Sequence, residues 1–269
     1  MAASLAAARR ELMRRLRNVR RLRNASHRAR VTSVADPADD RPPLNVLHIG
    51  KTGGTALKHV LSENQDASRY QLLFRGHDVT LADLPRGERF MFLIRDPLTR
   101  FVSAFNGRLR EDRPRYHYPW RDEERVAFAI FKTPDQLAVA LSSSDAEARE
   151  AAEQAMRGIG HVNTPYTVWF ADESALRDRL PDIFFIGLQE RLNEDFELLK
   201  GKLGLPREVR LPGDETVAHK TPPGFEDRLS ERGRLNLERW YERDLRLVRL
   251  CHELAPLVNA AHAEAAVRA

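Results

Sequence analysis

The residues best suited to chemistry lie in one glycine-rich stretch, Gly50-Lys51-Thr52-Gly53-Gly54-Thr55. Residues 44–49 before it are mostly apolar and predict a buried strand, while the apolar residues of 56–61 recur at helical spacing. A strand that turns through two glycines into a helix leaves backbone N–H groups free at the helix start. Together with the helix dipole and the Lys51 ammonium, these donors predict a phosphate-binding site.

This stretch matches only the end of the Walker A motif, G-x-x-x-x-G-K-[ST]. Asn45 lies where the first glycine of that motif is required, and residues 46–49 belong to the predicted strand. The loop is therefore too short to wrap a triphosphate, and it suits a single terminal phosphate better. A kinase or NTPase that binds ATP or GTP is the alternative, although no strand clearly ends in an aspartate suited to Mg²⁺.

A second set of polar residues follows another predicted strand, residues 90–94. Arg95-Asp96-Pro97 ends this strand, and Pro97 opens a helix that carries Ser103. Ligands of open parallel sheets bind at the carboxyl edge of the strands. Arg95 can make bidentate contacts with phosphate there, and Ser103 can add a neutral donor. The alternative is an Arg95–Asp96 pair that only caps the helix.

The elements around these residues predict one α/β domain. Strands are expected at residues 44–49, 70–74, 90–94 and 183–187, with helices between them. Their continuous apolar character predicts a P-loop-like parallel β-sheet flanked by helices on both faces. The domain is expected over 44–269, after a basic arm and linker over 1–43 that is poorly ordered or helical. A helical stretch over 226–254 is expected to direct four side chains to the core: Leu235, Trp240, Leu245 and Val248.

Composition narrows the setting in which this domain works. The net charge of +5 comes from the arm, because residues 1–30 hold ten arginines and one acidic residue. The single cysteine, Cys251, excludes an intrachain disulfide and favours a reducing compartment. The sequence contains no run of about 18 apolar residues, so no membrane span is predicted. Arg9 and Arg10 interrupt the only stretch that resembles a secretory signal. We expect a cytoplasmic protein, and the excess of arginine over lysine favours a bacterial source.

Together the two motifs resemble the sulfotransferases that use 3′-phosphoadenosine-5′-phosphosulfate (PAPS). The most similar branch is that of carbohydrate sulfotransferases with a His-Ile-Pro-Lys-Thr-Gly-Gly-Thr loop. Here the loop reads His48-Ile49-Gly50-Lys51-Thr52-Gly53-Gly54-Thr55, with Gly50 in place of the proline. Residues 95–105 resemble the 3′-phosphate segment of that family, 183–190 a later strand, and 229–244 its C-terminal helix.

The resemblance implies a role for each of these residues. The 5′-phosphosulfate would be held by Lys51, Thr52, Gly53, Gly54 and Thr55. Arg95 and Ser103 would hold the 3′-phosphate, and Lys220 in the loop 206–224 would fold over the nucleotide. Lys51 would also act in catalysis, because it would meet the negative charge that grows on the bridging oxygen during in-line attack. No metal is expected, since no His, Cys and carboxylate set has ligand spacing.

The reaction also needs a base and an acceptor. His77 is the candidate base, because an ordinary pKa of about 6.5 suits proton transfer at neutral pH. The resembled branch carries Tyr-His-Gly-His here, whereas this chain has Phe74-Arg75-Gly76-His77. Asp78 and Glu63 are the alternatives for the base, His48 is expected to cap the strand end, and His161 and His252 have no supporting context.

The resemblance implies a carbohydrate or glycolipid as the acceptor. Aromatic residues 116–120 either stack against a sugar or form a packed loop. The arginine-rich residues 1–30 either form a solvated arm or touch the inner face of a membrane. A non-enzymatic reading, in which the arm tethers the domain to membrane or nucleic acid, is the third hypothesis; nucleic acid is not an expected partner of the domain.

Overall fold

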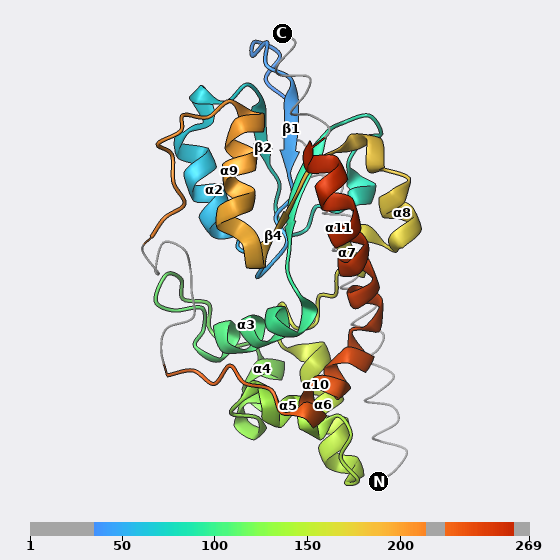
Figure 1. Ribbon diagram of the computed structural model, residues 1–269. Coiled ribbons are helices and arrows are strands. Elements are labelled where there is room, and N and C mark those ends of the chain that lie inside the picture. The colour runs from blue at the N-terminus through green and yellow to red at the C-terminus, as the bar shows by residue number, and fades with distance from the viewer. Residues whose placement is uncertain (1–34, 214–223, 261–269) are drawn as a thin grey trace. The chain divides into compact units, whose positions relative to one another are not determined.

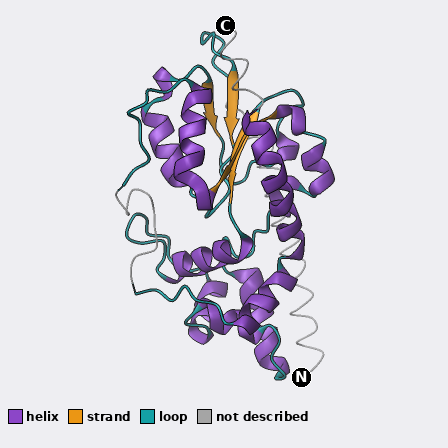
Figure 2. Ribbon diagram, in the orientation of Figure 1, coloured by secondary structure: helices purple, strands orange, loops and turns teal. Residues whose placement is uncertain are grey.

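The computed structural model describes residues 35–213 and 224–260. The chain separates into two units, Met1–Asp39 and Asp40–Ala269, and the fold below is that of the second. Its centre is a four-stranded parallel sheet in the order β2-β1-β3-β4 (Figures 1 and 2). The strands are β1 (Pro43–Val46), β2 (Gln71–Phe74), β3 (Phe90–Ile94) and β4 (Ile183–Leu188). The predicted α/β fold with a parallel sheet is confirmed.

Helices cover both faces of this sheet because side chains along β3 alternate between two apolar clusters. Met91 and Leu93 pack under α2 (Gly54–Glu63) and α9 (Leu192–Leu203). The opposite face of β3 packs under three helices, α7 (Thr167–Phe170), α8 (Glu173–Arg177) and α11 (Glu242–Ala260). Figure 1 shows α2 and α9 on one side of the strands and α11 on the other. All five residues of β3 are buried, as its continuous apolar sequence predicts.

The connection from β3 to β4 holds a separate group of helices, which we call the helical cluster. Its members are α3 (Pro97–Leu109), α4 (Asp122–Ile130), α5 (Pro134–Ala140) and α6 (Ala146–Gly158), joined by α10 (Glu231–Trp240). They share an apolar core of their own and lie beyond the carboxyl ends of the strands (Figure 1). The helix start predicted at Thr133 is confirmed, because the Thr133 hydroxyl accepts the Gln136 N–H at 3.1 Å.

Two expectations about element ends differ from the structure. The first strand ends at Val46 rather than Ile49, although the Leu47 N–H still donates to the Met91 carbonyl at 2.9 Å. The C-terminal helical stretch divides at Tyr241 into α10 and α11. The placement of Leu235 in the core is wrong, since it is 40% exposed. The buried side of α10 carries Leu237 and Asn236 instead.

The outer edge of β4 is covered by a side chain from the end of α11. The Ile186 N–H donates to Asn259 Oδ1 at 3.1 Å, and Asn259 Nδ2 donates to the Ile186 carbonyl at 2.9 Å. Lys202 on α9 adds a second link to the same helix end, because its Nζ donates to the Val258 carbonyl at 2.9 Å. These contacts fix the C-terminal turn of α11 against the sheet.

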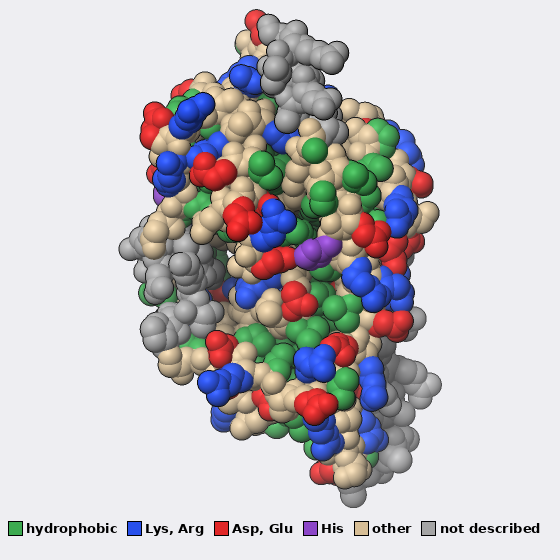
Figure 3. Space-filling model, in the orientation of Figure 1, with side chains coloured by type: hydrophobic (Ala, Val, Ile, Leu, Met, Phe, Trp, Pro, Cys, Tyr) green, Lys and Arg blue, Asp and Glu red, His purple; other side chains and the backbone are tan. Residues whose placement is uncertain are grey.

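The surface in Figure 3 carries basic and acidic side chains interspersed with one another. Such a face offers no extended field of one sign to a long charged polymer. Within residues 35–213 and 224–260, no helix is long and apolar enough to cross a membrane. The arginine-rich residues 1–30 lie outside the described residues, and their membrane contact remains a prediction.

Candidate functional site

The site lies where the connections of two neighbouring strands diverge. β1 and β3 are adjacent, and the chain leaves β1 through α2 on one face of the sheet. After β3 it enters the helical cluster and then α7 and α8 on the other face. Such a divergence is the usual position of ligand sites in open α/β sheets. The glycine-rich loop follows β1, and Arg95 follows β3, so both predicted motifs meet at this point.

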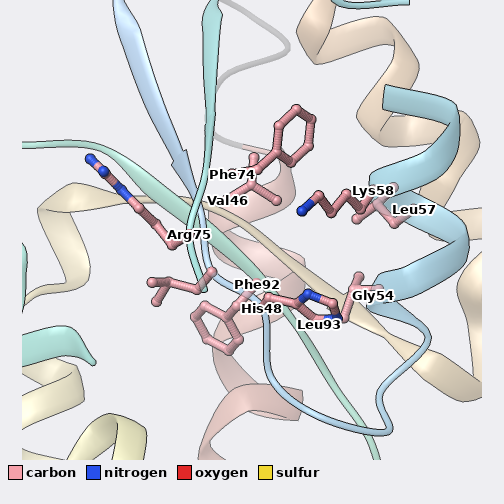
Figure 4. A pocket seen from close by; sticks show the side chains of 10 residues that line it. Val46, His48, Gly54, Leu57, Lys58, Phe74, Arg75, Phe92 and Leu93 are labelled. Atoms are coloured by element: carbon pink, nitrogen blue, oxygen red, sulfur yellow. The ribbon is translucent and has the colours of Figure 1, made fainter. Parts of the chain in front are cut away.

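The loop presents free backbone donors at the start of α2. Gly53 adopts a left-handed conformation with φ 89°, which glycine tolerates without strain. The start of α2 has no side-chain cap and no acidic residue in its first turn. A side chain at Gly54 would meet His48, because an added Cβ would lie 2.8 Å from His48 Cδ2. Figure 4 shows the His48 ring beside Gly54. Both glycines thus serve the loop conformation, and the uncapped helix start suits an anion.

Asn45 explains why this loop departs from the Walker A pattern. It is fully buried in the sheet, where its side-chain oxygen accepts the Arg75 Nε–H at 2.7 Å. Its Nδ2 donates to Glu88 Oε2 at 3.1 Å. A residue fixed within a strand in this way cannot form part of a phosphate-wrapping loop, so the binding loop begins after β1.

Lys51 is buried in an ion pair beside the loop. Its Nζ donates to Asp112 Oδ1 at 2.7 Å, and the two side chains are 8% and 6% exposed. Asp112 Oδ2 accepts from Arg108 Nη1 at 2.8 Å. Arg108 in turn makes a two-pronged contact with Glu124 on α4, at 2.8 and 2.7 Å. Four charged groups from the loop, α3, the turn after α3 and α4 therefore form one chain of contacts.

Arg95 reaches across from β3 to the loop. Its Nη1 donates to the Lys51 carbonyl at 3.4 Å, and its Nε donates to Thr99 Oγ1 at 3.1 Å. The Tyr166 hydroxyl fixes its backbone by accepting the Arg95 N–H at 3.1 Å and donating to the Arg95 carbonyl at 2.7 Å. Asp96 caps α3 through the Thr99 N–H at 2.8 Å. The Arg95 guanidinium thus lies at the loop, while Asp96 performs the capping.

Ser103 lies on the same side of α3 as these contacts. It is half-buried and follows Thr99 by one helical turn, and Gly107 follows it by another. Thr99 contacts Arg95, and a Cβ added at Gly107 would lie 2.5 Å from Lys51 Nζ. This side of α3 therefore lies against Arg95 at Thr99 and against Lys51 at Gly107. Ser103 lies between these two contacts.

Arg100 is a residue of the site that the sequence pattern did not single out. It is 3% exposed, and its Nε donates to the Gly50 carbonyl at 2.8 Å. Its Nη2 donates to the Thr164 carbonyl at 2.9 Å, and its guanidinium lies 4.7 Å from the Tyr166 ring centroid. Arg100 ties the loop entry to α3. Arg100 lies between the buried residues Leu98 and Phe101, and no local pattern indicated that it reaches residues 50 and 164.

Three histidines gather beside the loop. The rings of His48 and His77 are 4.0 Å apart, and those of His77 and His161 are 5.7 Å apart. Burial, with the charge of His77, lowers the pKa of His48 to about 3. Burial and the Lys51 charge also lower the pKa of His77 and, more strongly, that of His161. All three rings are therefore neutral at pH 7, and His77 and His161 both face Lys51.

His161 joins the site because Gly50 leaves room for it. A Cβ added at Gly50 would lie 2.6 Å from His161 Nδ1, and His161 itself has a φ of 64°. No context in the sequence supported a role for His161, but the structure places its ring beside Gly50 and His77. The only sequence signal was the glycine that replaces the proline of the resembled loop.

The remaining candidates lie as follows. The Thr52 hydroxyl is buried and donates to the Ile49 carbonyl at 2.9 Å, so its backbone N–H is the group left for an anion. Thr55 is half-buried in the first turn of α2. Glu63 pairs with His59 at 3.5 Å, and His252 pairs with Glu190 at 3.2 Å. Lys220 lies outside the described residues.

Among the residues that the structure describes, no group of three or more His, Cys, Asp or Glu could hold a metal ion. The arrangement instead offers backbone N–H donors, Lys51 and Arg95, which are groups that bind phosphate through charge and hydrogen bonds.

A parallel sheet flanked by helices, with a glycine-rich loop after one strand and an arginine after its neighbour, is an α/β fold of the kind that binds ligands at the carboxyl edge of its strands. The sequence model of the sulfotransferase family matches residues 38–249, and the chain belongs to that family. Neither the curated proteins nor the solved structures contain a match to this sequence. Family membership favours a sulfuryl-transferring enzyme over the kinase or NTPase alternative.

Proposed function

We propose that this protein transfers a sulfuryl group from PAPS to a hydroxyl of a carbohydrate or glycolipid. One observation carries the proposal: Arg95 is hydrogen-bonded to the Lys51 carbonyl at the start of an uncapped helix, within a chain of the sulfotransferase family. This pairing offers two separate groups for anions, the loop and the guanidinium. A donor with phosphates at both its 5′ and 3′ positions matches such a pair better than a nucleoside triphosphate does.

Different residues are the proposed ligands of the two phosphate groups of PAPS. The backbone N–H groups of residues 52–55 and the Lys51 ammonium are the proposed ligands of the 5′-phosphosulfate. Arg95 and Ser103 are the proposed ligands of the 3′-phosphate, because Arg95 contacts Thr99 on α3 and Ser103 follows Thr99 by one turn on the same side of that helix. Lys220 remains a candidate to cover the nucleotide.

PAPS supplies the sulfuryl group, whose bond to the phosphate oxygen breaks as the acceptor oxygen bonds to sulfur. Lys51 stabilises the charge on the departing oxygen, because a buried ammonium interacts strongly with a developing negative charge. His77 takes the proton of the acceptor hydroxyl. Its neutral ring at pH 7 can accept that proton, and a negatively charged donor beside it would raise its pKa from the lowered value.

A hollow beyond the C-terminal end of α3 supports an acceptor of sugar type. Its volume is about 560 Å³, and its lining combines two aromatic residues, Trp120 and Phe225, with three charged ones, Arg110, Glu111 and Arg113. Aromatic faces and charged donors together suit a polar ring molecule. Glu111 of this lining precedes Asp112, whose carboxylate accepts from Lys51 Nζ at 2.7 Å. We therefore assign the acceptor to this hollow, next to the turn that contacts Lys51.

The donor assignment is tested by thermal unfolding with nucleotides. Adenosine 3′,5′-bisphosphate is expected to raise Tm, whereas ATP and GTP at equal concentration are not, because binding to the native state alone stabilises it. Lys51→Ala is expected to abolish most transfer to a panel of hydroxylated glycans supplied with radiolabelled PAPS. A magnesium-dependent rise in Tm with ATP, or wild-type transfer by the Lys51→Ala protein, would reject the proposal.

A further inference from the structure

The Lys51 ammonium is buried against the carboxylate of Asp112, which belongs to neither recognised motif. Asp112 lies 61 residues away in the sequence, and its Oδ1 is 2.7 Å from Lys51 Nζ. An ammonium that is 8% exposed loses most of its hydration, so its charge depends on the partner that replaces water. The identity of that partner therefore matters to any reaction in which Lys51 takes part.

Asp112 is itself fixed on its other side. Arg108 Nη1 holds Oδ2 at 2.8 Å, and the Asp112 N–H donates to the Gly107 carbonyl at 2.7 Å. Both Glu111 and Asp112 adopt left-handed backbone conformations, with φ of 56° and 60°. Such conformations are uncommon for non-glycine residues, although aspartate adopts them more readily than most, and two in succession are supported here by the hydrogen bonds of the turn. The turn after α3 is thus shaped to direct Asp112 Oδ1 toward the lysine.

The facing side of α3 leaves room for this ion pair. A Cβ added at Gly107 would lie 2.5 Å from Lys51 Nζ and 3.0 Å from Asp112 Oδ1. Any larger residue at position 107 would push the ammonium away from the carboxylate. The contact is therefore supported by three features of the chain: the carboxylate, its arginine anchor and the glycine.

We infer that Asp112 is a positioning residue for sulfuryl transfer, which fixes the Lys51 ammonium beside the loop and keeps it protonated; this inference rests on the proposed function. An ammonium has three N–H groups. One of them is used by Asp112, which leaves two that can be directed to the donor. A lysine that lost its proton could not stabilise the departing oxygen.

The groups around Lys51 show why this carboxylate is needed. Arg108 and Arg110 come from α3 and the turn after it, His77 from the segment after β2, and His161 from the segment after α6, while Arg95 contacts the Lys51 carbonyl. Burial, with the charges of Arg110 and Arg108, lowers the pKa of Lys51, and Asp112 opposes this shift. Among the residues that the structure describes, Asp112 is the acidic group that keeps the proton on this lysine.

The test measures the protonation of Lys51 directly, in the full chain without nucleotide. Acetic anhydride reacts only with a neutral amine, so the extent of Lys51 acetylation, read by peptide mass spectrometry from pH 6 to 10, gives a half-labelling pH. Asp112→Asn is expected to lower this pH by about 1–3 units, the usual effect of removing an opposite charge at this range. Glu111→Gln, which removes the neighbouring carboxylate, is the matched control and should leave it unchanged.

A second variant covers the case in which Asp112→Asn fails to fold. Gly107→Ala keeps every charge but displaces the ammonium from Asp112, so it is expected to lower the half-labelling pH by a smaller amount. A structural role for Asp112 would change the stability of the protein and not the labelling pH of Lys51. Unchanged labelling in the folded variants overturns the inference.

The same proteins separate this inference from the proposed function. In calorimetric titrations from pH 7.5 upward, above the second ionisation of the phosphates at about pH 6, wild type should bind adenosine 3′,5′-bisphosphate with a steady affinity up to its own half-labelling pH. Asp112→Asn should lose affinity as the pH rises through the lowered labelling pH. Failure of wild type to bind the nucleotide rejects the proposed function, while a shifted labelling pH would still support the role of Asp112 toward Lys51.

Discussion

At the residue scale, the pairing of Gly50 with His161 distinguishes this loop from the one it resembles. The resembled loop has proline where this chain has Gly50, and here the imidazole of His161 lies against that position. The extra ring stands next to His77 and faces Lys51. The loop and the segment after α6 are therefore matched to each other.

The contact between Gly50 and His161 should appear as a coupling energy in a double-mutant cycle of these two residues. Gly50→Ala is expected to destabilise the protein by about 1–3 kcal/mol, the usual cost of overpacking. His161→Gly removes the ring, and glycine tolerates the positive φ of position 161. Gly50→Ala should therefore lower the free energy of unfolding much less in the double variant than in wild type. Urea unfolding of the four proteins gives the coupling energy. Equal costs of Gly50→Ala with and without the His161 ring would contradict the match.

Local patterns in the sequence were enough to predict those site residues whose positions are set by a single strand end or helix start. The loop, Arg95 after its strand and Pro97 at the start of α3 all follow from patterns within a few residues. The partners of Lys51 do not, because Asp112 and His161 reach it through the packing of the helical cluster. No periodicity links residues so far apart in the chain, so these contacts could only be found in the structure.

At the scale of elements, Glu124 joins three segments of the helical cluster. It receives both prongs of Arg108 from α3, the Arg121 N–H at the start of α4 and the Gly160 N–H next to His161. The hydrogen bonds from Arg108, Arg121 and Gly160 overcome its burial and lower its pKa to about 2. Its charge is therefore present across the ordinary pH range, and it anchors the arginine that holds Asp112.

Loss of this anchor should cost far more than loss of a surface pair. Glu124→Gln removes one partner of a buried ion pair, for which about 3–5 kcal/mol is expected. Asp122→Asn on the same helix breaks the exposed Asp122–Arg125 contact of 3.1 Å, and should cost at most about 1 kcal/mol. Urea unfolding of both variants makes the comparison. Similar costs would show that the buried chain of charges is not a main support of the helical cluster.

The order of the elements was easier to predict than their ends. β3 begins and ends as expected because its limits, Arg89-Phe90 and Ile94-Arg95, are the points where apolar sequence meets charge. The first strand was predicted three residues too long, since Leu47 and Ile49 are apolar and buried without lying in the sheet. Burial beneath a loop and burial within a strand give the same sequence pattern.

At the scale of the whole molecule, the histidines make folding sensitive to acid. The folded-state pKa of His48 is about 3, against about 6.5 for an ordinary histidine. The unfolded chain therefore binds more protons between these values. The stability that neutral His48 provides is complete above pH 6.5 and is lost as the pH falls toward 3. The lowered pKa values of His77 and His161 act in the same direction.

Thermal unfolding at pH 7.5 and 5.0 checks this dependence. The Tm of wild type is expected to decrease from pH 7.5 to 5.0. The decrease should be smaller for His48→Asn, because this variant lacks one of the groups that gain a proton on unfolding. His252→Asn at an exposed position controls for the removal of a histidine as such. A His48→Asn protein with the same loss of Tm as wild type would refute the assignment.

Asn259 at the end of α11 has a consequence for how copies of this protein behave toward one another. β4 is an outermost strand, and unpaired backbone groups on such a strand can pair with a strand of another molecule and seed aggregates. The Asn259 amide occupies both the N–H and the carbonyl of Ile186, much as a neighbouring strand would. One side chain thus closes the middle of the exposed edge, and the final turn of α11 protects the protein from self-association at this strand.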